Sequence, residues 1–139
     1  MVIVDTTVWI DYLGGASTPA TSWLESELGR QPLGLTDLVL CEVLQGIRGD
    51  EAFRQARRDL GRFPIFGTGG VVLAVAAARN YRSLRKNGYT IRKTVDCLIA
   101  TFCLEAEFWL LHGDRDFDPF EEFLGLRVIH PEVVEQERN

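Results

Sequence analysis

The feature that most constrains the fold is an alternation of short apolar runs with longer stretches of helical character. Five runs are too short for helices and rich in apolar residues; they span 2–4, 33–35, 63–66, 109–111 and 127–129. Strands that alternate with helices predict a parallel sheet with helices on both faces. Because 139 residues is the size of one domain, we expect a single α/β domain over 1–139 with about five buried parallel strands.

The stretches between these runs carry helix signals. Three helices are predicted to start after the capping residues Thr18, Thr36 and Asp50, and a fourth is predicted to open at Thr94. The oxygen of such a side chain can accept a hydrogen bond from a free N–H in the first helical turn. A fifth helix is predicted over 71–87, where basic residues in the last turn and Gly88 indicate the C-terminal end.

The apolar segments are too short for a membrane protein. The run 71–78 falls well below the roughly 20 residues that span a bilayer. The N-terminus, Met-Val-Ile-Val-Asp, lacks the basic segment of a signal peptide, so we expect a cytoplasmic protein. Cys41, Cys97 and Cys103 have no CxxC spacing and lie in apolar-rich segments, which favours buried thiols over zinc or redox roles.

Charge is distributed unevenly along the chain. The net charge of −5 counts against a protein that is held on nucleic acid by its overall charge. Every charged residue in 79–93 is basic, however, whereas 104–139 are mainly acidic. Arginines in and near the basic stretch, among them Arg82, Arg85 and Arg92, could contact phosphate oxygens. A solvated helix face is the alternative interpretation.

Carboxylates lie where the predicted strands lead into helices. Asp5 directly follows the first run, Asp114 and Asp116 follow 109–111, and Glu42 and Asp96 lie in the helices that begin near Thr36 and Thr94. Ligands of parallel α/β sheets bind beyond the carboxyl ends of the strands, so these five acids could converge there. Converging carboxylates repel one another, and a divalent cation would offset the repulsion.

The donor types select the cation and the chemistry. Carboxylate oxygens with almost no histidine or cysteine favour Mg²⁺ or Mn²⁺ over Zn²⁺. Such a site supports phosphodiester hydrolysis, in which the ion activates water and offsets charge on the phosphate. Thr6 and Thr7 could position the water or a phosphate. Taken singly, Asp5 could be a helix cap and Asp96 a partner of the helix dipole, so the prediction depends on the joint pattern.

These residues resemble the PIN domain, and within it the VapC toxins of bacterial toxin–antitoxin pairs. The resemblance covers nearly the whole chain and depends on four motifs in order, which are VDTTVWI at 4–10, EVLQG at 42–46, RKTVDCLIA at 92–100 and GDRDF at 113–117. It implies a Mg²⁺- or Mn²⁺-dependent endoribonuclease that forms a homodimer and is inhibited by a small cognate antitoxin of the VapB type, which docks over the active-site region.

The resemblance also assigns roles to the acids. It makes Asp5, Glu42, Asp96 and Asp114 the metal ligands and adds Asp116 as a fifth catalytic acid. It further favours phosphate contacts by Arg82, Arg85 and Arg92, since the family's basic segment borders the cleft. The chain departs from the family pattern at His112, where many members have a threonine; His112 could replace that hydroxyl as a hydrogen-bond donor or proton carrier.

Two other classes of protein compete with this interpretation. A receiver-type Mg²⁺-binding signalling domain would need an acidic pair after the first strand and a lysine after a late strand, but Asp5 is followed by threonines and the only lysines are Lys86 and Lys93. A catalytically silent PIN-like interaction module stays open. Residues 67–70, Gly-Thr-Gly-Gly, lack the spacing of a nucleotide-binding loop and indicate a turn before the long helix.

Overall fold

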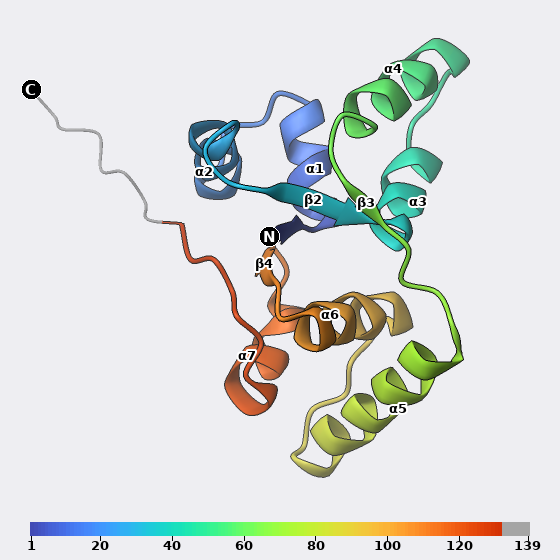
Figure 1. The fold of residues 1–139 in the computed structure, drawn as a ribbon, viewed down its shortest axis with the longest axis vertical. Coiled ribbons are helices and arrows are strands. Elements are labelled where there is room, and N and C mark those ends of the chain that lie inside the picture. Colours follow the sequence, from blue (N-terminus) through green and yellow to red (C-terminus); the bar gives the residue numbers. More distant parts are fainter. Residues whose placement is uncertain (132–139) are drawn as a thin grey trace, which may run out of the picture.

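Four parallel strands form the centre of the protein in a computed structural model, which describes residues 1–131 (Figure 1). The strands are β1 (Val2–Val4), β2 (Leu33–Thr36), β3 (Ile65–Phe66) and β4 (Trp109–Leu111), in the spatial order β3-β2-β1-β4. The fifth predicted strand is reduced to one parallel bridge between Val128 and Leu110. Two backbone hydrogen bonds of Leu110, each 2.9 Å long, hold that segment beside β4.

Seven helices and one 3-10 turn connect the strands of the described chain. They are α1 (Thr6–Leu13), α2 (Pro19–Glu27), α3 (Asp37–Gln45), α4 (Asp50–Leu60), α5 (Val71–Lys86), α6 (Thr94–Ala106), η1 (Arg115–Phe117) and α7 (Asp118–Leu124). In Figure 1, α1, α2 and α4 lie above the sheet, and α5, α6 and α7 lie below it. Both faces are therefore covered, as the alternation of strands and helices predicts.

The helix starts agree with the sequence in part. Thr18 and Thr36 cap α2 and α3, and their side chains each accept a 3.1 Å hydrogen bond from a first-turn N–H. The prediction for Asp50 was wrong, because the cap position of α4 is Gly49 with φ of 88° and Asp50 is the first helical residue. The short helix α7 was not predicted, since seven residues give little periodic signal.

The core lies between the sheet and both helical layers. Ile3 of β1, Trp9 of α1, Ile99 of α6 and Phe117 of η1 are fully buried. The expectation that every strand is buried fails at β3, where Ile65 is exposed at the edge of the sheet. Within residues 1–131, no helix is long and apolar enough to cross a membrane.

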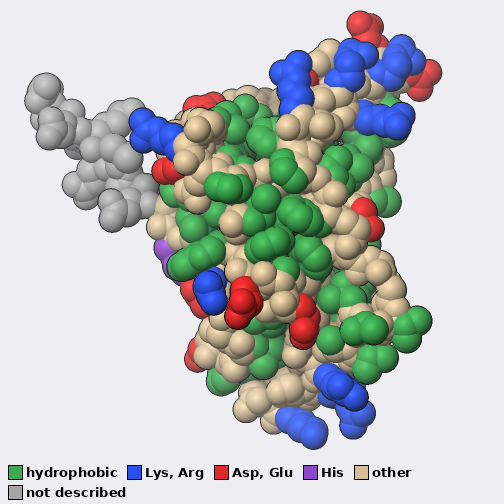
Figure 2. Space-filling model, in the orientation of Figure 1, with side chains coloured by type: hydrophobic (Ala, Val, Ile, Leu, Met, Phe, Trp, Pro, Cys, Tyr) green, Lys and Arg blue, Asp and Glu red, His purple; other side chains and the backbone are tan. Residues whose placement is uncertain are grey.

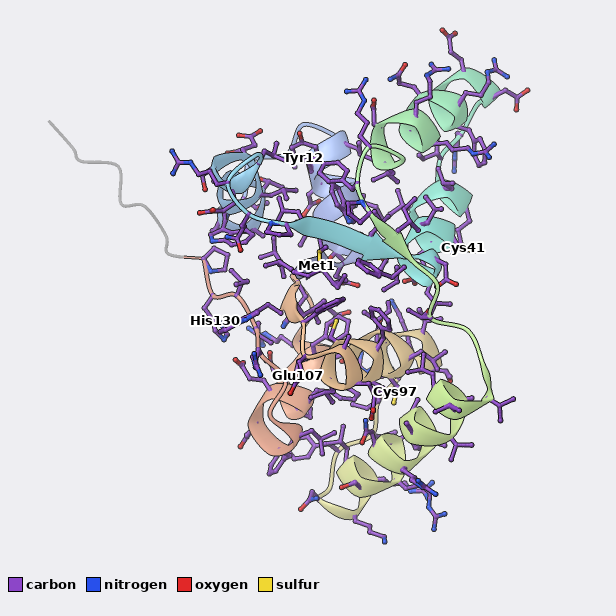
Figure 3. The ribbon with its side chains drawn as sticks, viewed as in Figure 1. Met1, Tyr12, Cys41, Cys97, Glu107 and His130 are labelled. Atoms are coloured by element: carbon purple, nitrogen blue, oxygen red, sulfur yellow. The ribbon has the colours of Figure 1, made fainter. Side chains whose placement is uncertain are left out.

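The cysteines differ in their surroundings. Cys97 and Cys103 are buried, and the Sγ atom of Cys97 donates a 3.2 Å hydrogen bond to the carbonyl of Ala77. Figure 3 shows Cys97 between α6 and α5, and Cys41 on the outer side of α3. Cys41 is exposed, so the prediction of a buried thiol there was wrong. Its apolar neighbours in sequence point to other sides of α3.

Candidate metal centre

The carboxyl ends of β1 and β4 bring the first acid into place. The backbone N–H of Asp5 donates a 2.9 Å hydrogen bond to the carbonyl of Leu111, which joins the two strand ends. Asp5 occupies the cap position of α1, but its carboxylate makes no capping hydrogen bond. Its side chain is 3% exposed, and Oδ1 has no hydrogen-bond partner among the described residues. A capping role therefore does not explain this buried acid.

Three further acids form the centre of the site. Asp96 lies in the first turn of α6 and is 5% exposed, and its Oδ2 likewise has no partner among residues 1–131. Asp114 and Asp116 lie in the loop that follows β4. Each of the three offers a carboxylate oxygen within 4.8 Å of those of the other two. Of the five acids predicted to converge, these three come together at this edge of the sheet.

Glu42 approaches from α3 and is held by α1. Its Oε1 accepts a 2.8 Å hydrogen bond from the hydroxyl of Thr6. Asp5 and Glu42 lie outside the 4.8 Å group. In addition to burial, the charge of Glu42 nevertheless helps to raise the pKa of Asp96, and the charges of Asp96 and Asp114 help to raise the pKa of Asp5. Thr7 is exposed, and its hydroxyl would lie 3.5 Å from a Cβ built on Gly113, so it faces the loop after β4.

The acids shift the pKa values of one another. Burial is the largest cause that raises the pKa of Asp5 to about 7, and the negative charges of Asp96, Glu42 and Asp114 add to it. A hydrogen bond from the N–H of Thr6 opposes this rise in pKa. Burial also raises the pKa of Asp96 to about 6, followed by repulsion from Asp114. Both carboxyls thus bind protons more tightly than ordinary aspartates, and a bound cation would favour their ionised forms.

His112 shapes the loop that carries Asp114 and Asp116. The N–H of Asp114 donates a 3.1 Å hydrogen bond to Nδ1 of His112, whose ring packs against Phe117 with the ring centroids 4.9 Å apart. The N–H of Asp116 in turn donates 2.9 Å to Oδ1 of Asp114. Because burial lowers the pKa of His112, the neutral ring can keep Nδ1 as an acceptor. His112 therefore positions an acid through backbone contacts, which its sequence position alone does not reveal.

The predicted arginines occupy different places. Arg92 lines a cleft of about 310 Å³ that also includes Arg115 and Asp116, so it adjoins the acidic centre. Arg82 instead lines a separate groove between α5 and α6. Arg85 lies over the ring of Tyr81, with its guanidinium carbon 5.6 Å from the ring centroid. Sequence position identified the basic region but not which arginine lies beside the acids.

The residues present fit a hard divalent cation. The three central ligand atoms are carboxylate oxygens, and buried Asp5 and Asp96 each have an oxygen without a protein partner among the described residues. Oxygen donors of this kind suit Mg²⁺ or Mn²⁺. Converging acids at the carboxyl edge of a parallel sheet therefore form a site that is suited to a divalent cation.

The chain belongs to the PIN-domain family, whose sequence model matches residues 2–122. It is similar to a VapC ribonuclease of Mycobacterium bovis and to ribonuclease VapC11 of Mycobacterium tuberculosis. Each is 26% identical over 130 residues, which cover 92% of this chain and 97% of the relative. The sequence-based assignment to this family is thereby confirmed.

Solved structures show the same fold. The VapBC2 complex of Rickettsia felis bound to a promoter DNA fragment contains a chain that aligns with a TM-score of 0.74 and 16% identity, over 93% of this chain and 98% of that one. VapBC-1 from nontypeable Haemophilus influenzae aligns with a TM-score of 0.70 and 16% identity, over 93% and 97% of the two chains.

Proposed function

We propose that this protein is a metal-dependent endoribonuclease that acts as the toxin of a toxin–antitoxin pair. The observation that carries the proposal is the convergence of Asp96, Asp114 and Asp116 at the carboxyl edge of the sheet. Buried Asp5 and Asp96 each add an oxygen that has no hydrogen-bond partner among residues 1–131. The family membership and the relatives named as ribonucleases support it. Burying such charges without an offsetting partner is costly, so their presence favours a role in binding a cation.

The proposed cation is Mg²⁺ or Mn²⁺. Asp5, Glu42, Asp96 and Asp114 would hold it, and Asp116, whose carboxylate adjoins two of them, would complete the catalytic set. When bound, such an ion supplies an activated water and offsets negative charge on the scissile phosphate.

The chain's own residues position this machinery. Thr6 fixes the carboxylate of Glu42 through its hydroxyl, so we assign it to positioning rather than to direct substrate contact. Thr7, which faces the loop after β4, stays available for a phosphate. We propose that Arg92 contacts the RNA backbone beside the acids, and that Arg82 and Arg85 contact it farther along α5.

The proposed protein partners are a VapB-type antitoxin and a second copy of this chain. An apolar groove of about 430 Å³ between α1, α3 and α4, lined by Ile10, Leu13, Val43 and others, offers a surface for the antitoxin. Exposed valines at the start of α5 offer a surface for dimerisation. Figure 2 shows hydrophobic side chains gathered at that corner and at the centre of the same face.

Sedimentation at several concentrations tests the proposed homodimer, and a strictly monomeric chain would rule it out. Inhibition of cleavage by a co-expressed small antitoxin tests the other partner. Because the proposed substrate is bacterial RNA, we propose that the protein acts in the cytoplasm, which cell fractionation would check.

One experiment tests the proposed activity directly. The antitoxin-free protein is incubated with total bacterial RNA and Mn²⁺, and new 5′ ends are mapped by sequencing. Asp5→Asn and a chelator serve as parallel controls. We expect discrete cuts that disappear in both controls. Metal binding without any cuts would instead favour a catalytically silent PIN-like module.

A further inference from the structure

We propose that the cleft beside the acidic centre binds one unpaired RNA base next to the scissile phosphate and prefers bases that carry an exocyclic amino group. This inference rests on the proposed ribonuclease function and adds a substrate preference to it. The cleft lies between the loop from α5 to α6, at 89–92, and the segment 115–122, which comprises η1 and the first part of α7.

The cleft is connected to the metal centre by Asp116. This residue lines the cleft, and its carboxylate also belongs to the group of three whose oxygens lie within 4.8 Å of one another. At about 310 Å³ the cleft is at the small end of the range of ligand sites. A chain whose phosphate lies at the acids would therefore place a neighbouring nucleotide in this cleft.

The charges in the cleft are not neutralised by one another. Arg92 and Arg115 line it together with Asp118 and Glu122. Among residues 1–131, however, the single ion pair is His130 with Glu121, and none of these four side chains makes a hydrogen bond. Two guanidinium groups are thus free to contact phosphate, and two carboxylates are free to accept hydrogen bonds from a ligand.

A pair of aromatic side chains lies at the edge of this cleft. Tyr89 lines the cleft and is 37% exposed. Its ring packs on that of Phe123, which is 42% exposed, with the ring centroids 5.0 Å apart at an angle of 45°. This contact joins the α5–α6 loop to α7 and holds the Tyr89 ring as a platform. Unpaired RNA bases stack on exposed aromatic rings of this kind.

The carboxylates give the cleft its preference. Ionised Asp118 and Glu122 are acceptors only, so a base in contact with them must donate. Cytosine and adenine present an exocyclic amino group at the position where uracil presents a carbonyl oxygen, which a carboxylate repels. Guanine also carries an amino group, on another edge of the base. We therefore expect cytosine, adenine or guanine at this position and discrimination against uracil.

The test uses the full chain and short single-stranded RNA oligonucleotides with each of the four bases on either side of one cleavage position. Cleavage with Mn²⁺ gives kcat and KM, and anisotropy of fluorescent oligonucleotides in EDTA gives binding without cleavage. The variants are Tyr89→Ala, Tyr89→Phe and Glu122→Gln. Phe53→Ala is the matched control, since Phe53 is an aromatic residue on α4 that is 38% exposed and does not line the cleft.

We expect Tyr89→Ala to raise KM about tenfold with little change in kcat, while Tyr89→Phe and Phe53→Ala stay close to wild type. Glu122→Gln should reduce the discrimination against uracil about tenfold, because an amide can also donate. If the wild-type protein cleaves RNA and Tyr89→Ala changes neither the cleavage kinetics nor the base preference, this inference is wrong. The proposed ribonuclease function would then still stand. If the wild-type protein does not cleave RNA, the proposed function is wrong. If it then also binds all four oligonucleotides equally in EDTA, the proposed base preference of the cleft is wrong as well.

Discussion

The start of α2 and the acidic edge of the sheet solve the same local problem in opposite ways. At α2, Thr18 and Thr21 exchange hydrogen bonds of 3.1 and 2.8 Å, so each satisfies an N–H of the other. At the start of α1, Asp5 has the equivalent position, but its buried Oδ1 has no hydrogen-bond partner among residues 1–131. The first arrangement stabilises the fold by itself, whereas the second leaves a buried carboxylate oxygen that a bound cation would stabilise.

The variant Asp96→Asn gives the strongest test of whether the acidic edge, unlike the α2 cap, serves a bound cation. If the edge serves a cation, removal of one central charge should lower RNA cleavage about a hundredfold or more, as loss of a preorganised electrostatic group does. The fold should be retained, because the change also removes repulsion with Asp114. End-labelled RNA and circular dichroism measure the two effects. A fully active and folded Asn variant would disprove the assignment of this site.

The pH dependence of stability should differ between the two regions by a few kcal/mol. The pKa of Asp5 is about 7 in the folded protein, against 3.8 for an unperturbed aspartate such as that of the unfolded chain. Between these two pH values the folded state therefore binds more protons than the unfolded state. The free energy of unfolding of metal-free protein should therefore fall as pH rises through this window, by on the order of a few kcal/mol.

Urea unfolding in EDTA at several pH values measures this slope. In Asp5→Asn the fall should be clearly smaller, because no proton is released at that position, while Asp96, whose pKa is raised to about 6, still contributes to it. Glu25→Gln is the control, since Glu25 is an exposed acid on α2 and its loss should leave the slope unchanged. A slope in Asp5→Asn as steep as in wild type would contradict the cause that we assign.

Added Mg²⁺ or Mn²⁺ should stabilise the folded protein through the acidic edge of the sheet. At a concentration of about a hundred times Kd, a ligand that binds only the folded state adds about 2.7 kcal/mol. We expect Mg²⁺ or Mn²⁺ to raise the Tm of the wild type and of Glu25→Gln, with a much smaller rise for Asp96→Asn. Scanning calorimetry with and without EDTA would show this. An equal rise in all three proteins would indicate that the cation binds elsewhere.

The two regions also differ in how far the sequence predicts them. The Thr18 cap could be predicted because its partners lie within three residues along the chain. The convergence of Asp96, Asp114 and Asp116 could also be predicted, because parallel strands bring their carboxyl ends to one edge. The alternation of strands and helices likewise predicted the sheet and both helical layers.

Contacts between distant side chains could not be predicted. Thr6 donates to Glu42 across 36 positions, and the cleft combines Tyr89 with Glu122 from separate segments. Neither contact leaves a periodic or local signal. Cys41 was misassigned for a related reason, since apolar neighbours in sequence do not fix which side of α3 a residue occupies.

We expect the smallest effect from Thr18→Ala. This variant tests the cap of α2 and leaves the acidic edge unchanged. It removes the acceptor of the 3.1 Å bond from the N–H of Thr21, and loss of such a cap costs about 1 kcal/mol. Urea unfolding should show this loss at every pH and with or without Mn²⁺, while the rate of RNA cleavage stays unchanged because α2 contributes no acid to the centre. A matching loss of cleavage would mean that the α2 cap and the acidic edge are coupled, and that the separation between a self-sufficient region and one dependent on a ligand does not hold.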